Sequence, residues 1–228
     1  DVADINHDGL PDIMSLDMLP EDETVLKRSE GDDDIQIQKM KTEKFGYHHQ
    51  FSRNMLFINQ PDSKFMETAL LSGIAATDWS WSSLFGDYNQ DGELDLFISN
   101  GIPKRPNDLD FIKFASSEQI QNKLNKTKLV DQQALDMMPS GKIQNYIFKG
   151  LDNLEFEDKS NEWLAPKSSI SGATALGDLD NDGDLDLVVN NLNQETALYI
   201  NQTDSKKNFL KIQFEYKRDN HFGIGTKV

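Results

Sequence analysis

Residues 178–189 read DLDNDGDLDLVV, and this stretch decides how the rest of the chain is interpreted. Acidic side chains stand at the first, third, fifth and ninth of these positions, and Gly183 stands at the sixth. Residues 187–189 are apolar and include two β-branched side chains, which is typical of a buried strand. The stretch therefore predicts a turn lined with oxygen ligands that leads directly into a β-strand.

The same pattern occurs twice more, as DINHDGLPD at residues 4–12 and DYNQDGELD at residues 87–95. All three fit D-x-[DN]-x-D-G-x-x-D. When the sequence is shifted by 91 residues, residues 54–100 align with residues 145–191 without a gap. A further partial copy begins with LYINQ at residues 198–202 and matches LFINQ at residues 56–60. The chain is therefore built from a repeated unit, and such periodicity indicates a repeat architecture.

Each unit contains several short apolar segments separated by turn-forming residues, so we predict an all-β fold. A unit of about 48 residues matches the size of a four-stranded propeller blade. Two complete units and two halves are fewer than the four blades of a closed ring, so we expect a partial propeller. Residues 1–200 form this repeat region, with insertions at about 18–53 and 104–143. The second insertion has helical spacing and is expected to be mainly helical. A degenerate blade within either insertion is the alternative.

The three loops offer the oxygen ligands that calcium prefers, namely carboxylates, amide carbonyls and backbone carbonyls. The side chains at positions 1, 3 and 5 can converge on one point, and the glycine at position 6 permits a sharp turn. The carbonyl of position 7 and the side chain of position 9 would complete the ligand shell. We therefore predict up to three Ca²⁺ ions. The expected ligands are Asp4, Asn6, Asp8, Leu10 and Asp12 in the first loop, Asp87, Asn89, Asp91, Glu93 and Asp95 in the second, and Asp178, Asp180, Asp182, Asp184 and Asp186 in the third.

Two other interpretations of the loops were weighed. The first is a set of Asx-Gly turns that hold no metal, but packing several carboxylates together is self-repelling unless a cation lies among them. The second is an EF-hand, which requires a glutamate at position 12. Ser15, Ile98 and Val189 stand at that position here. Magnesium accepts fewer protein ligands, and transition metals prefer Cys or paired His. Calcium is therefore the preferred ion.

The composition excludes several function classes. The chain has a formal net charge of −16, which argues against binding to nucleic acid. It has no cysteine and no apolar run long enough to span a membrane, and it opens at Asp1 without a signal peptide, as an internal piece of a longer chain would. No recognised catalytic motif occurs, so no catalytic residues are predicted. Trp79 and Trp81 are expected to pack in the core or between blades rather than stack on a sugar, and His48 and His49 to form a solvated pair.

The loops and their strand setting resemble FG-GAP or VCBS repeats, the calcium-loop blades of integrin α-subunit propellers and many bacterial surface proteins. Residues 85–86 supply the FG element, whereas GAT at residues 172–174 only partly matches GAP. The wider arrangement is similar to a Bacteroidetes subfamily, through DMLP at 17–20, TDWSW at 77–81, NGI at 100–102 and DLDF at 108–111. Residues 201–228 resemble a last strand pair and the start of an ASPIC/UnbV domain, through FLKIQF at 209–214 and GIGTKV at 223–228.

This resemblance implies export to the cell surface, the outer membrane or the periplasm. It also implies a non-catalytic scaffold that binds a protein or glycan partner. The alternative is a calcium-dependent enzyme acting on polysaccharides, either a lyase or a hydrolase, or the accessory propeller of such an enzyme. Fold alone does not separate these functions. The scattered basic residues of the chain favour the scaffold, because a lyase would need a cleft lined with Lys, Arg, Tyr or His.

Overall fold

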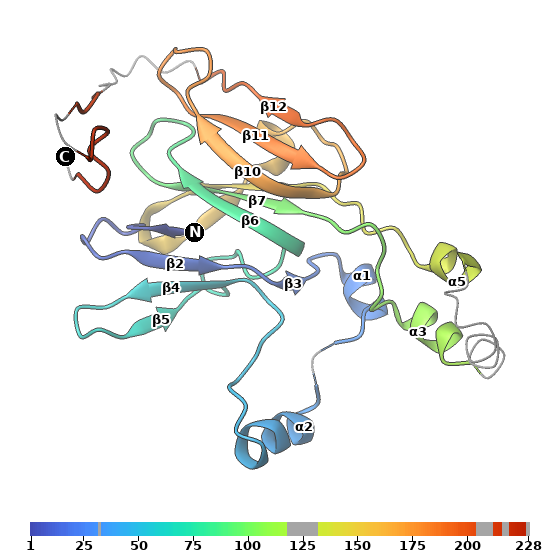
Figure 1. Cartoon of the computed structure of the whole chain (residues 1–228). Coiled ribbons are helices and arrows are strands. Elements are labelled where there is room, and N and C mark those ends of the chain that lie inside the picture. The colour runs from blue at the N-terminus through green and yellow to red at the C-terminus, as the bar shows by residue number, and fades with distance from the viewer. Residues whose placement is uncertain (32, 118–131, 204–211, 216–218, 227–228) are drawn as a thin grey trace.

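The computed structural model describes residues 1–31, 33–117, 132–203, 212–215 and 219–226 of the chain. This part of the chain is mostly β, which confirms the expected fold class at that level. Its strands form three antiparallel sheets that lie next to one another, with short helices outside them (Figure 1).

The first sheet has the strand order β1-β2-β4-β5 and the second has the order β3-β6-β7-β8-β9. The third has the order β10-β11-β12. The strands of the first sheet are β1 (Val2–Ala3), β2 (Asp12–Ser15), β4 (Met55–Asn59) and β5 (Phe65–Glu67). Those of the second are β3 (Met18–Leu19), β6 (Asp78–Gly86), β7 (Asp95–Asn100), β8 (Tyr146–Gly150) and β9 (Phe156–Asp158). Those of the third are β10 (Ser171–Gly177), β11 (Asp186–Asn191) and β12 (Ala197–Tyr199).

The strand pairings of the three sheets keep the 91-residue spacing of the sequence. Phe57 pairs with Glu67 between β4 and β5, and Phe148 pairs with Asp158 between β8 and β9. Gly86 pairs with Asp95 at the end of β6, as Gly177 pairs with Asp186 at the end of β10. Residues that are equivalent in the sequence therefore occupy equivalent places in neighbouring sheets.

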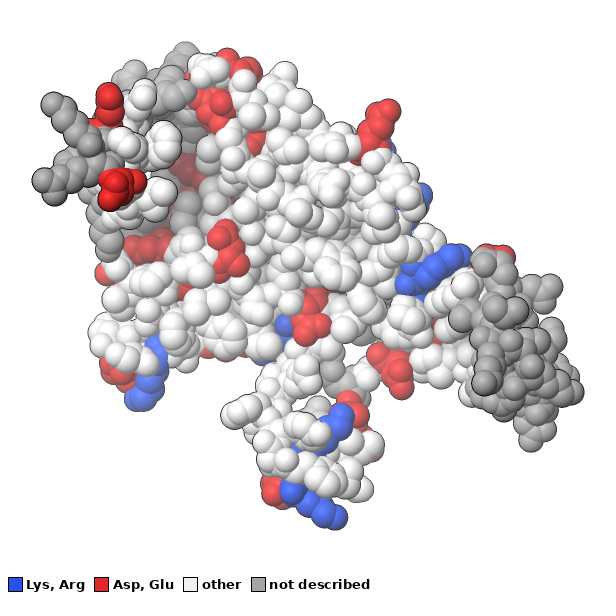
Figure 2. All heavy atoms as spheres, viewed as in Figure 1, with Lys and Arg blue, Asp and Glu red and all other residues white. Residues whose placement is uncertain are grey.

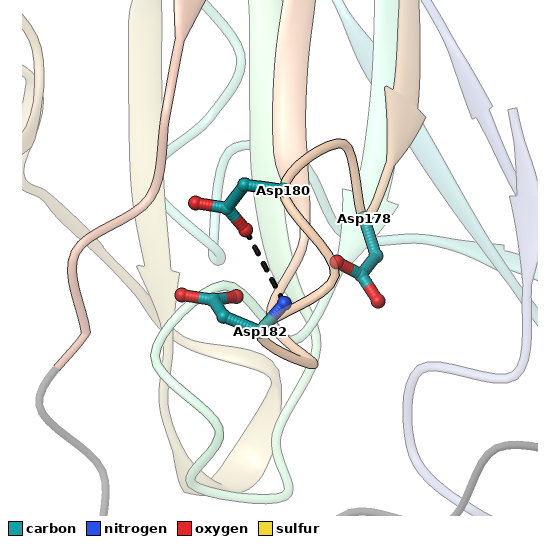
Figure 3. Close-up of side chains that lie close together, drawn as sticks. All are labelled: Asp178, Asp180 and Asp182. Atoms are coloured by element: carbon teal, nitrogen blue, oxygen red, sulfur yellow. Dashed lines mark hydrogen bonds between the residues drawn. The ribbon is translucent and has the colours of Figure 1, made fainter.

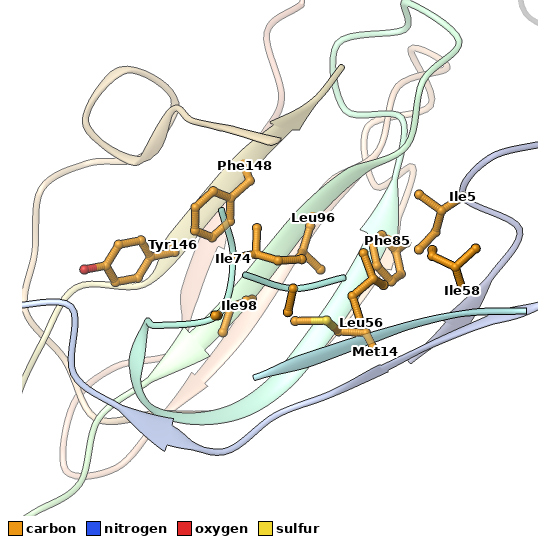
Figure 4. Packing of buried hydrophobic residues seen from close by; sticks show 12 residues of the cluster. Ile5, Met14, Leu56, Ile58, Ile74, Phe85, Leu96, Ile98, Tyr146 and Phe148 are labelled. Carbon is orange, nitrogen blue, oxygen red and sulfur yellow. The ribbon is translucent and has the colours of Figure 1, made fainter. Parts of the chain in front are cut away.

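Two apolar layers hold the three sheets together, and β7 contributes to both. All six residues of β7 are buried, because one face of the strand packs toward the first sheet and the other toward the third. Leu96 and Ile98 lie in the first layer (Figure 4), whereas Phe97 lies in the second. The first layer consists of Ile5, Met14, Leu56, Ile58, Ala69, Ile74, Ala75, Phe85, Leu96, Ile98, Tyr146 and Phe148. The second consists of Tyr88, Phe97, Ile147, Leu164, Leu187 and Val189.

Short helices occupy the two expected insertions. The first contains α1 (Glu23–Arg28), α2 (Ile35–Lys39) and the π-helical turn η1 (Met40–Lys44). The second contains α3 (Leu109–Ala115) and α5 (Gln132–Met137). The 3₁₀ turn η2 (Asp152–Leu154) and α6 (Ser160–Trp163) lie beside β8 and β9. Asp22 caps α1 and Asp34 caps α2, each by accepting two backbone N–H groups of the first turn. Both insertions thus contain short helices in their described residues, and residues 118–131 of the second insertion lie outside the described part of the chain.

A buried ion pair fixes the second insertion to the central sheet. Nη2 of Arg105 lies 2.7 Å from Oδ2 of Asp78, at the start of β6, and both side chains are more than nine-tenths buried. The two insertions also contact each other, because Arg28 lies 3.2 Å from Asp108 and Glu30 donates its backbone N–H to the carbonyl of Asn107. The helical segments are therefore joined to the β core and to one another by polar contacts.

Two further expectations concern the C-terminal segment and membrane-spanning helices. The strand expected at residues 209–214 lies largely outside the described residues, and no strand is formed by the described residues beyond Tyr199. Within the described part of the chain, no helix is both long enough and apolar enough to cross a membrane.

Candidate metal centres

The three acidic loops each connect two antiparallel strands, at one side of the stack of sheets (Figure 1). Residues 4–12 connect β1 to β2, residues 87–95 connect β6 to β7, and residues 178–186 connect β10 to β11. Several acidic side chains are visible on this side of the surface (Figure 2). The sequence repeat therefore places three similar loops next to one another.

The loops share one backbone conformation. The fourth residue of each has a positive φ, 57° at His7, 54° at Gln90 and 64° at Asn181. The glycine at the sixth position also has a positive φ, for example 97° at Gly92 and 98° at Gly183. Glycine adopts this conformation without steric cost, which confirms the role expected for the sixth position. The chain therefore turns twice within each loop.

The first carboxylate of the loop accepts hydrogen bonds from the turn that follows it. Asp4 accepts the backbone N–H groups of Asp8, at 3.0 Å, and of Gly9, at 2.8 Å. In the second loop, Asp87 accepts the N–H groups of the equivalent residues, including that of Gly92 at 3.0 Å. These bonds hold the first and fifth positions on the same side of the turn. The amides at the third position, Asn6 and Asn89, then contact the fifth carboxylate in these two loops.

The third loop brings three carboxylates together (Figure 3). One ligand oxygen from each of Asp178, Asp180 and Asp182 lies within 4.8 Å of the other two, and among the described residues these three form the group of acidic side chains placed closely enough to hold a metal ion. Burial and the charge of Asp182 both raise the pKa of Asp180. A cation bound here would remove this repulsion.

Asp184 adds a fourth carboxylate to the third loop. The sequence predicts only a contribution from its backbone carbonyl. In the structure its side chain is 4% exposed, and its Oδ1 atom has no hydrogen-bond partner. Burial, together with the neighbouring charge of Asp182, raises the pKa of Asp184 to about 6. A buried carboxylate oxygen without a partner beside three other carboxylates is an arrangement that a bound cation would stabilise.

The carboxylates at the ninth position have a structural role that the sequence does not predict. All three are fully buried, and each accepts two backbone N–H groups. One oxygen accepts from the second residue of the same loop. The other accepts from a residue at the end of, or just after, the strand that pairs with the strand leaving the loop. The bonds from the loop come from Ile5 to Asp12, Tyr88 to Asp95 and Leu179 to Asp186. Those from the next strand come from Asn59, Gly150 and Asn201 respectively.

The expected metal-binding role of this ninth position stays a prediction. A carboxylate oxygen has two lone pairs, so an oxygen that accepts one N–H can also coordinate an ion. Burial raises the pKa of Asp95 to about 6, although the N–H groups of Gly150 and Tyr88 act in the opposite direction. The ninth residue therefore connects the loop to the β core whether or not a cation is bound.

A lysine lies against the second loop. Nζ of Lys149, on β8, is 2.9 Å from Oδ2 of Asp91. The contact with Asp91 raises the pKa of Lys149. Partial burial raises the pKa of Asp91, but its hydrogen bonds with Lys149, Glu93 and Asn89 hold that pKa below its ordinary value. The two residues are far apart in the sequence, so the motif alone does not reveal this contact.

Neighbouring loops also contact each other. The side chain of Gln90, at the fourth position of the second loop, donates to the carbonyl of Gly183 in the third, at 3.2 Å. His7, at the fourth position of the first loop, lies 3.8 Å from the carboxylate of Glu93 in the second. The three loops therefore form one continuous acidic region.

The donor set of the loops fits calcium. Every side-chain ligand predicted at positions 1, 3, 5 and 9 ends in a carboxylate or amide oxygen, and hard oxygen donors in this number suit Ca²⁺. The third loop brings three of the carboxylates together, and the acidic charge is concentrated most strongly there. The residues present are therefore suited to hold the ion that the sequence predicts.

The other candidates behave differently. Trp81 is 58% exposed and donates its ring N–H to the carbonyl of Gly101, so it does not pack in the core, and its packing between blades stays a prediction. Its neighbour Trp79 is half-buried. His48 and His49 are exposed and line a cavity of about 810 Å³ beside α2 and η1. His49 stacks on Phe51, with 6.4 Å between ring centroids.

No protein-family model matches the chain, and no curated protein matches it.

Proposed function

We propose that this chain is a non-catalytic, calcium-binding module of an exported or cell-surface protein, built from propeller-like blades of the FG-GAP or VCBS type. The observation that carries the proposal is the recurrence of one loop design in three neighbouring sheets. Each loop has the same positive-φ positions and a carboxylate at its first, fifth and ninth residues. A single loop of this kind could be an ordinary turn, but three in register favour a shared ligand.

The hydrogen bonds within the loops support cation binding. In the first and second loops, backbone N–H groups of the turn already donate to the carboxylates of positions 1 and 5, so the turn is formed before an ion arrives. A preformed turn reduces the conformational entropy that binding must overcome. Protein-supplied oxygens then exceed the number that magnesium usually accepts.

The outer faces of the stack support a partial propeller. Ile13 in β2 is 37% exposed, whereas Leu96 at the equivalent place in β7 is completely buried between two sheets. Leu198 in β12 is 57% exposed on the other side of the stack. In a ring of blades such faces would be covered by neighbouring sheets. The proposal therefore includes additional blades on both sides.

The scaffold role follows from the same features. Calcium would stabilise the hairpins of the sheets, while the helical insertions and the exposed Trp81 lie away from the loops and are available to a protein or glycan partner. Free calcium is abundant outside cells, where extracellular-type sites bind it at about 10⁻⁴–10⁻³ M. This range is the reason for proposing the cell surface, the outer membrane or the periplasm.

Isothermal titration calorimetry of the chain, first freed of divalent ions with a chelator, tests the proposal. We expect calcium to bind with up to three sites per chain, and magnesium at equal concentration to compete poorly. The triple variant Asp8→Ala, Asp91→Ala and Asp182→Ala serves as the control and should give no heat of binding. Equal heats from the wild type and the triple variant would contradict the assignment of the loops.

A further inference from the structure

The second loop differs from the other two because a positively charged side chain lies against it. The ammonium group of Lys149 lies 2.9 Å from Oδ2 of Asp91, the fifth residue of the loop. The two side chains are 30% and 29% exposed, so the pair is partly shielded from water. A positive charge thus lies against one of the carboxylates predicted to bind calcium.

The position that Lys149 occupies has an equivalent in each of the other two sheets. Lys149 directly precedes Gly150, which donates its backbone N–H to the ninth residue of the second loop. Isoleucine stands at the same place beside the other loops. Ile58 precedes Asn59, which donates its backbone N–H to Asp12. Ile200 precedes Asn201, which donates its backbone N–H to Asp186. The position that carries an ammonium group against the second loop therefore carries an apolar residue in the other two sheets.

The third loop has the opposite character. It contains five aspartates, at 178, 180, 182, 184 and 186, where the second loop has three aspartates and one glutamate. The side chain of Asp184 is buried, with one oxygen lacking a hydrogen-bond partner. Glu93, at the equivalent position of the second loop, has a side chain that is 38% exposed and lies near His7. Negative charge is therefore concentrated in the third loop and partly neutralised in the second.

We propose that Lys149 is an internal counter-ion that weakens calcium binding at the second loop, so that the third loop fills at lower calcium concentration than the second. This inference rests on the proposed function, because it assumes that the loops bind calcium. For Asp91 to coordinate an ion through Oδ2, the ammonium group must move away and lose its ion pair. If it stays, it repels the arriving cation, since like charges close together disfavour each other.

Nuclear magnetic resonance resolves the loops individually. In a calcium titration of the ¹⁵N-labelled chain, the amides of Gly92 and Gly183 report the second and third loops. In the wild type we expect the Gly183 signal to reach its midpoint first. Lys149→Met keeps the aliphatic stem but removes the charge, and should lower the calcium concentration at the Gly92 midpoint roughly three- to tenfold. The midpoint of Gly183 should change much less.

Two controls separate the local charge from other effects. Lys27→Met removes one exposed positive charge on α1, where Lys27 pairs with Glu23, and should leave both midpoints unchanged. Lys149→Arg keeps the charge and should keep the second loop weak. If Lys149→Met does not give a folded spectrum, Lys149→Gln provides the same test with a polar side chain.

The outcomes distinguish this inference from the proposed function. An unchanged Gly92 midpoint in Lys149→Met, with Gly183 still responding to calcium, would overturn the counter-ion role and leave the proposed function intact. Gly92 responding before Gly183 in the wild type would also overturn it. If neither glycine responds to millimolar calcium in either protein, both proposals fail.

Discussion

The carboxylate of Asp95 accepts the backbone N–H of Gly150 at 3.0 Å, and so ties the second loop to β8. The approach is close enough to require glycine, since a Cβ at Gly150 would lie 2.3 Å from the carbonyl oxygen of Leu94. The other oxygen of Asp95 accepts the N–H of Tyr88 at 2.9 Å. One fully buried side chain therefore connects the entry and exit of the loop to the adjacent strand.

The two hydrogen bonds that Asp95 accepts should stabilise the fold with or without calcium. Asp95→Ala should lower the free energy of unfolding by about 2–4 kcal/mol even in excess chelator, because two buried N–H groups lose their acceptor. Asp91→Ala in the same loop is the matched control and should cost much less in chelator, since Asp91 is partly exposed. Urea unfolding monitored by fluorescence measures both. Equal losses in the two variants would show that the ninth position has no special structural role.

Calcium should stabilise the folded chain. At about 1 mM calcium, sites with dissociation constants of about 10⁻⁴–10⁻³ M contribute roughly 0.4–1.4 kcal/mol each through ligand linkage. Three sites would therefore contribute about 1–4 kcal/mol. Differential scanning calorimetry in calcium, in chelator and in magnesium checks this. Identical melting temperatures in calcium and in chelator would indicate ordinary turns.

Each loop should bind calcium independently, so that one calcium site can be abolished by mutation without loss of the others. Asp182→Ala removes the fifth ligand of the third loop and should abolish one calcium site, with the number of sites counted by equilibrium dialysis. The first and second loops retain all their ligands and should still bind. Asn181→Gly, which changes a loop residue outside the predicted ligand set and tolerates its positive φ, is the matched control. Loss of all binding in Asp182→Ala would contradict separate sites.

The buried pair of Arg105 and Asp78 should stabilise the chain only when both partners are present. Removing one partner leaves an uncompensated buried charge, so Arg105→Met or Asp78→Ala should each cost about 3–5 kcal/mol. The double variant should cost less than the sum of the two single variants. A double-mutant cycle in urea measures this coupling, and additive losses would show that the pair does not act as a unit.

A second ion pair should make stability depend on pH. The hydrogen bond from Arg53, 2.6 Å long, lowers the pKa of Glu67 below its ordinary 4.5. Because the folded-state pKa is depressed, the stabilisation is fully present above about pH 4.5 and is lost as the pH falls through the lower, folded value. Glu67→Gln should be less stable than the wild type at pH 7, by about 0.5–1 kcal/mol. The difference should shrink in acid, and a constant difference across this range would contradict the assignment.

Much of the β architecture could be predicted because its signals are local. The loop motif, the apolar strands that follow it and the 91-residue spacing are all visible in the sequence, and the strand pairings keep that spacing. The glycines at 92 and 183 were also predictable, since only glycine adopts positive φ freely. The exposure of Trp81 was not predictable, because alternation along a strand does not say whether another sheet covers that face.

The mostly β fold class and the positions of three turns rich in oxygen donors follow from the sequence, because both depend on residues within a few positions of one another. Which neighbours those turns have depends on long-range packing. It placed Lys149 against Asp91, joined Asp95 to Gly150 and buried Arg105 with Asp78. These contacts connect residues that are 27 to 58 positions apart, and burial between packed sheets and insertions, rather than any local pattern, brings them together.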